Sequence, residues 1–124
     1  MSLSRSTVRL SLLAAFVALA ASACGSSSPA SPTVAAAPDV IISILGVRGS
    51  ASFAPSPTTM RVGQTVAWQN TDTIAHDATQ DAARFATATV NAGATSAPVT
   101  MSTAGTFTYH CSIHPGMIGT ITVQ

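Results

Sequence analysis

Short segments of alternating apolar and polar residues constrain the fold of this chain most. Segments 106–111 and 117–123 alternate strictly, and 65–70 and the β-branched run 39–47 have a similar character. Such alternation places successive side chains on opposite faces of a β-strand. Glycines and prolines separate the segments, and no long helical pattern interrupts them. We therefore predict that residues 39–124 form an all-β domain, an antiparallel β-sandwich.

One connection within this domain has a weaker pattern. Residues 81–87 are expected to form a single helical turn, with Phe85 directed into the interior. The rest of the region 77–97 carries no readable periodicity.

Residues 1–23 resemble an export signal. Arg5 and Arg9 precede an uncharged apolar run, which is shorter than the roughly 20 residues that a membrane-spanning helix requires. The run ends in small residues before Cys24 and resembles the bacterial lipobox. We expect cleavage before Cys24 and its lipidation, which would anchor the exported protein in the cell envelope, on the periplasmic side of a membrane. The alternative is an ordinary signal cleaved at an Ala-x-Ala sequence.

The charge of the chain excludes some partners. Only 7% of the 124 residues are charged, against about a quarter in typical soluble domains. No basic run exists that could bind a phosphate backbone, so nucleic acid is not an expected partner. Removal of segment 1–23 would leave three arginines against four aspartates, a formal charge of −1. Segment 24–38, rich in Ser, Ala and Pro, is expected to be a tether.

Cys111 has no partner for a disulfide if Cys24 is lipidated, and metal ligation would explain a free thiol in an oxidising compartment. Cys111, His114 and Met117 follow at intervals of three residues in the loop between the last two predicted strands. A tight turn can bring their side chains around one point. A thiolate, an imidazole and a thioether disfavour hard ions and favour copper, and a His₂Cys site with a long axial Met is typical of electron-transfer copper.

A second histidine is needed for such a site. His110 precedes Cys111 in a predicted strand and therefore points to the opposite face. His76 follows the end of another predicted strand, in a loop that can approach Cys111. We assign one copper ion to His76, Cys111 and His114 as equatorial ligands, with Met117 as the weak axial ligand. Zinc is disfavoured because its usual fourth ligand is not a thioether.

The sequence resembles the plastocyanin, amicyanin and pseudoazurin group of cupredoxins, which are type 1 blue copper proteins. Trp68-x-Asn70-x-Asp72-x-x-x-His76 is similar to their first-ligand region, and Tyr109-x-Cys111-x-x-His114-x-x-Met117 to their ligand loop. The resemblance covers residues 39–124. It implies a Greek-key sandwich with the copper centre at one end, and outer-sphere transfer of one electron.

The resemblance also concerns the surroundings of the ligands. We expect Asn70, Asp77 and Ser112 to contribute hydrogen bonds around the site, with Asp77 orienting the His76 loop. Asp77 stands where these families often have Asn, and Gly116 stands where amicyanin has a bulky residue.

The predicted function is therefore electron transfer by a monomeric carrier, not an enzyme. Redox protein partners would dock at an apolar patch around His114, formed by Ile113, Pro115 and Gly116. A periplasmic copper carrier or buffer is the alternative. A second alternative is an enzyme subunit with a catalytic copper at His110, since Tyr109-His110-Cys111 resembles the bridge to such a copper in nitrite reductases. Those enzymes, however, have two such domains per chain and a longer loop between Cys and His.

Overall fold

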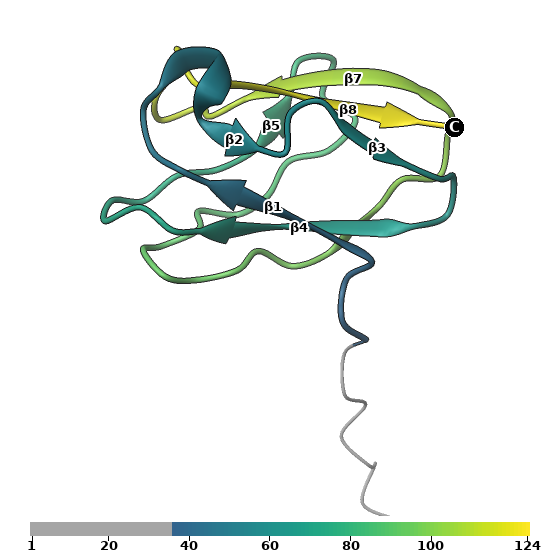
Figure 1. The fold of residues 1–124 in the computed structure, drawn as a ribbon, viewed down its shortest axis with the longest axis horizontal. Coiled ribbons are helices and arrows are strands. Elements are labelled where there is room, and N and C mark those ends of the chain that lie inside the picture. The colour runs from purple at the N-terminus through teal and green to yellow at the C-terminus, as the bar shows by residue number, and fades with distance from the viewer. Residues whose placement is uncertain (1–35) are drawn as a thin grey trace, which may run out of the picture. The chain divides into compact units, whose positions relative to one another are not determined.

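The computed structural model describes residues 36–124 (Figure 1). The predicted signal 1–23 and most of the tether 24–38 lie outside the described residues. The chain forms β1 (Val40–Ile44), a short 3-10 turn η1 (Gly49–Ala51), β2 (Phe53–Ala54), β3 (Thr58–Met60), β4 (Thr65–Asn70), β5 (Thr79–Gln80), β6 (Val99–Thr100), β7 (Gly105–His110) and β8 (Ile118–Val123). Within residues 36–124, no helix is long and apolar enough to cross a membrane.

The strands form two four-stranded sheets, in the orders β2-β1-β4-β6 and β3-β8-β7-β5. Figure 1 shows β1 beside β4 in one layer, and β3, β7 and β8 in the other. The predicted all-β sandwich is confirmed. Each sheet nevertheless contains one parallel pair, β1 with β4 and β3 with β8, so the sheets are mixed. The reason is that β2 and β3 belong to different sheets, so the chain crosses over before β4 returns beside β1.

Aromatic side chains from both sheets fill the core. The rings of Trp68 and Tyr109 are fully buried and meet edge to face, with centroids 5.5 Å apart. Phe85 packs against Trp68, with ring centroids 5.4 Å apart. The predicted helical turn at 81–87 is wrong, because the backbone N–H of Gln80 donates to the carbonyl of Phe85 and closes a non-helical loop. Phe85 is directed inward as expected.

Gly119 fixes where Tyr109 lies. The two residues are paired across β7 and β8. A Cβ atom on Gly119 would lie 2.3 Å from Cζ of Tyr109 and 2.4 Å from its hydroxyl oxygen. The tyrosine ring therefore crosses the neighbouring strand where only a glycine leaves room for it. Because Cys111 lies two residues after Tyr109, this packing also fixes the end of β7 at which the candidate site begins.

Candidate metal centre

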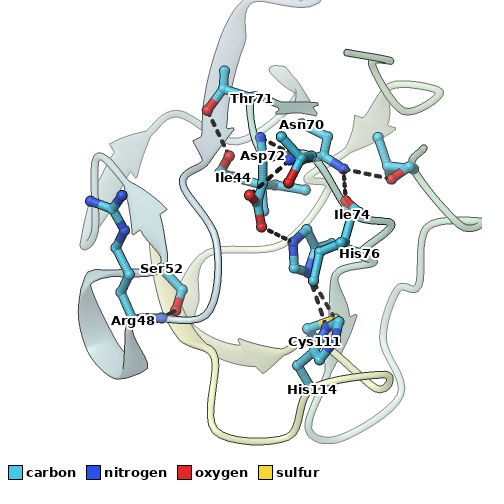
Figure 2. Close-up of polar contacts among 12 residues, drawn as sticks. Ile44, Arg48, Ser52, Asn70, Thr71, Asp72, Ile74, His76, Cys111 and His114 are labelled. Carbon is cyan, nitrogen blue, oxygen red and sulfur yellow. Dashed lines mark hydrogen bonds and ion pairs between the residues drawn. The ribbon is translucent and has the colours of Figure 1, made fainter. Parts of the chain in front are cut away.

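Three potential ligand atoms converge at one end of the sandwich (Figure 2). The Sγ atom of Cys111 lies 3.9 Å from Nδ1 of His76 and 3.8 Å from Nδ1 of His114. The two Nδ1 atoms are 3.2 Å apart. Within residues 36–124, no other three His, Cys, Asp or Glu side chains converge in this way. The sequence-predicted equatorial ligands are thus brought together by the fold.

Backbone hydrogen bonds hold the segments that carry these side chains. His76 lies after β4 and exchanges two hydrogen bonds with Val90, whose N–H donates to the His76 carbonyl at 2.7 Å and whose carbonyl accepts from His76 at 3.1 Å. In the ligand loop, the N–H of Cys111 donates to the carbonyl of Met117 at 3.2 Å. The N–H of Met117 donates to the carbonyl of His114 at 2.9 Å. Backbone hydrogen bonds therefore hold both ligand-bearing segments, the first by pairing with Val90 and the second within the ligand loop.

The donor atoms fit a copper ion. Nitrogen and sulfur ligands lie about 2.0–2.3 Å from a bound metal, so three of them in a trigonal plane are about 3.5–4.0 Å apart. The separations in this site, between 3.2 and 3.9 Å, are close to that range. Cys111 and His76 are fully buried, and Cys111 is a free thiol. A buried thiol facing two imidazole nitrogens is a soft, mixed donor set of the kind that suits copper.

Met117 is fully buried and belongs to the same apolar cluster as Cys111. Its backbone makes the two hydrogen bonds that close the ligand loop. The role of its thioether as an axial ligand stays a prediction.

Asp77 and Ser112 connect the two segments. The backbone N–H of Asp77 points to Sγ of Cys111 at 3.4 Å. The Asp77 carboxylate accepts a hydrogen bond from the N–H of Ser112 at 2.6 Å and another from the Ser112 hydroxyl. Each of these residues directly follows a candidate ligand, so their contact ties His76 to Cys111.

Asn70 organises the loop before His76. Its side-chain amide donates to the carbonyls of Ile74 at 2.7 Å and Val90 at 2.9 Å. Its Oδ1 accepts from the backbone N–H of Asp72 at 2.9 Å. A single buried amide thus fixes the loop between β4 and His76.

Asp72 is a part of the site whose role sequence reasoning missed. Its Oδ2 lies 2.9 Å from Nε2 of His76 (Figure 2), whereas the sequence predicts Asp77 as the orienting residue. The hydrogen bond from His76, followed by that from the N–H of Thr73, lowers the pKa of Asp72. The available signal was a carboxylate four residues before a candidate ligand.

His110 points away from the three ligands, as the alternation in β7 indicated. It pairs with Thr79 of β5, and its Nδ1 lies 2.7 Å from Oδ1 of Asp81. A hydrogen bond from the Thr108 side chain, and then that from His110, lowers the pKa of Asp81. Both members of this pair are substantially exposed.

The fold and the donor set define a class, that of β-sandwich proteins with a mononuclear copper site. The family model of copper-binding proteins of the plastocyanin/azurin family matches residues 41–124. The chain belongs to that family, and the predictions of a cupredoxin and of copper as its cofactor are confirmed.

Individual relatives agree with the family. The chain is 33% identical over 98 residues to a plastocyanin from Scenedesmus fuscus, in an alignment that covers 69% of this chain and all of that protein. It resembles the structure of a purple cupredoxin from Nitrosopumilus maritimus, with a TM-score of 0.61, 27% identity, and coverage of 69% of this chain and 100% of the other. A mutant amicyanin in its Cu(I) form shares the fold, with a TM-score of 0.59, 22% identity and coverage of 68% and 81%.

Proposed function

We propose that this chain is a one-electron carrier, in which a copper ion held by His76, Cys111 and His114 alternates between Cu(II) and Cu(I). Copper supplies the redox chemistry when bound. The observation that carries the proposal is the convergence of the three donor atoms from two segments that backbone hydrogen bonds hold in place. Met117 is the proposed axial ligand.

Rapid electron transfer requires that the ligands move little between oxidation states. The Asp77–Ser112 contact joins the segments, and the backbone bonds of Val90 and Met117 fix each of them. Complete burial of His76 and Cys111 excludes water from the inner side of the site. The protein therefore holds the ligands with hydrogen bonds and shields them from water on the inner side, which limits their movement between oxidation states.

His114 is the partly exposed ligand and provides the route for the electron. Its neighbours Ile113, Pro115 and Gly116 are exposed, with Ile113 about half accessible at 48%. A small apolar surface of this kind suits brief contact with a redox protein partner. We propose that a monomeric carrier docks there and passes the electron through the imidazole edge.

The N-terminal motif supports a location for this carrier. Lipidation of Cys24 after export would hold the domain at the envelope membrane through the tether 24–38. Mass analysis of the N-terminal peptide of the full chain, expressed in a bacterium, should detect the lipid. Cys24→Ala should release the protein from the membrane fraction, and equal membrane retention of that variant would contradict the proposal.

Copper titration of the purified domain tests the electron-transfer proposal. We expect one copper per chain, an intense blue colour, and reversible reduction through many cycles. Cys111→Ser should abolish the colour, whereas His110→Ala, altered at the neighbouring position, should keep both colour and redox cycling. A colourless, redox-silent complex would contradict the proposal, and copper that passes readily to a partner apoprotein would favour a carrier or buffer instead.

An enzymatic role for His110 would need further side chains beside it to bind a second copper ion. Among the described residues, Asp81 is its charged partner, and no third His, Cys, Asp or Glu side chain converges there. We propose that the pair has a structural role on the outer face of β7 and β5.

A further inference from the structure

We propose that Asp72 is a positioning residue that sets the reduction potential of this centre. Its carboxylate would hold His76 with the proton on Nε2, and its negative charge would favour the oxidised metal and so lower the reduction potential. The inference rests on the proposed function, since the potential has meaning only if copper cycles in the site.

The carboxylate of Asp72 makes two contacts, and the backbone of the residue makes a third. Its Oδ2 lies 2.9 Å from Nε2 of His76, and its Oδ1 accepts from the N–H of Thr73 at 2.7 Å. The backbone N–H of Asp72 donates to Asn70, a fully buried side chain whose amide is itself tied to two carbonyls. The direction of the carboxylate is therefore determined by the loop rather than by chance rotation.

This contact determines which nitrogen of His76 is free. A neutral imidazole has one N–H donor and one acceptor nitrogen, and an ionised carboxylate can only accept. Asp72 thus selects the tautomer protonated at Nε2. The lone pair is then on Nδ1, which faces Cys111 and His114.

The charge of Asp72 is separated from the metal position by a single imidazole ring. The His76 side chain is fully buried and that of Asp72 is only 25% exposed, so water screens their interaction incompletely. No arginine of residues 36–124 forms an ion pair with this carboxylate. Because Cu(II) carries one more positive charge than Cu(I), an uncompensated carboxylate here stabilises Cu(II) preferentially.

Gly46 leaves the space that the Asp72 carboxylate occupies. This residue lies just after β1 and has a φ of +103°. A Cβ atom at Gly46 would lie 2.9 Å from Oδ2 of Asp72, the oxygen that meets His76. A glycine is therefore required for two reasons, the backbone conformation and the space for the carboxylate.

The charge is tested with Asp72→Asn, which keeps the shape and an acceptor oxygen. We expect about a tenfold rise in the affinity of Cu(I) relative to Cu(II), equivalent to a potential about 59 mV higher. Asp39→Asn is the matched control, since it removes the same charge from the opposite end of β1, where Asp39 contacts Thr65. Equal shifts of potential in the two variants would overturn the proposal.

A second pair of variants moves the carboxylate without removing it. Gly46→Ala should displace Asp72 from His76 and raise the potential in the same direction. Gly63→Ala is the control, because Gly63 has a φ of +90° and no atom within 4 Å of an added Cβ. The Gly63→Ala variant introduces similar backbone strain and should leave the reduction potential unchanged. If Gly46→Ala also leaves the potential unchanged, the role of Asp72 is contradicted.

The copper-free protein provides a readout that does not depend on electron transfer. Nitrogen NMR of the His76 ring should detect a single tautomer protonated at Nε2 in the parent, and a mixture in Asp72→Ala. A parent ring protonated at Nδ1 would overturn the proposal even if the Asp72 variants fail to fold. A parent that binds no blue copper would instead count against the proposed function, leaving the tautomer result to decide the role of Asp72.

Discussion

The carboxylate of Asp77 accepts the backbone N–H of Ser112 at 2.6 Å, which joins the residue after one candidate copper ligand to the residue after another. Asp77 is only 8% exposed. Its own N–H is directed at the Cys111 thiol. The order of the site thus depends on a contact between two loops that lie far apart in the sequence.

We expect Asp77→Ala to destabilise the copper-free domain by about 1–3 kcal/mol, because it leaves the Ser112 N–H without its acceptor in a part-buried position. Chemical unfolding followed by fluorescence of the buried Trp68 measures this effect. Asp77→Asn, which retains one acceptor oxygen, should lose less stability than Asp77→Ala. Asp39→Ala is the matched control, because it removes the same two kinds of hydrogen bond, from the N–H and hydroxyl of Thr65, at an exposed position where water can replace them. An equal loss of stability in Asp39→Ala and Asp77→Ala would contradict the bridging role.

Gly119→Ala should destabilise the fold by about 1–3 kcal/mol, because the added methyl group overlaps the ring of Tyr109. Gly116→Ala is a matched control in the neighbouring loop, since an added Cβ there meets no atom within 4 Å. Thermal unfolding of the two variants makes the comparison. If both lose the same stability, the contact between Gly119 and Tyr109 does not constrain the sandwich.

The ligand loop could be predicted from the sequence because its information is local. Cys111, His114 and Met117 lie within one turn, and the alternation of β7 separates His110 from them. The pairing of β1 with β4 could not be predicted, because alternation identifies a strand but not the direction of its neighbour.

The sequence offers two carboxylates as partners for the His76 ring. Asp72 and Asp77 are both near His76 along the chain, and spacing alone does not decide which carboxylate meets the ring. That choice depends on Asn70 and on the pairing of His76 with Val90, across a region that carried no readable periodicity. Local spacing and strand alternation therefore indicated the candidate ligands, whereas the contacts around them required the tertiary structure.

Acid should destabilise the copper-free domain through Asp81, among other groups. Hydrogen bonds lower its pKa below the ordinary 3.8 in the folded state. A depressed folded pKa contributes stability above the unfolded pKa, and that contribution is lost as the pH falls through the folded value. Asp81→Asn should thus be less stable than the parent above about pH 4, and the difference should shrink below it. Unfolding measured from pH 6 to 2.5 checks this prediction. Arg84→Gln is the control, because the difference between its free energy of unfolding and that of the parent should not shrink over the same pH range.

Met117→Leu separates packing from ligation. Leucine has a similar volume, so the copper-free domain should lose less than about 1.5 kcal/mol of stability. Met101→Leu, at another buried methionine of the same core, is the matched control for packing. If the thioether is the axial ligand, its loss should raise the reduction potential and change the visible and paramagnetic-resonance spectra, because the weak fourth donor stabilises Cu(II) more than Cu(I). Spectra and a potential indistinguishable from those of Met101→Leu would remove Met117 from the ligand set and leave His76, Cys111 and His114 as the complete site.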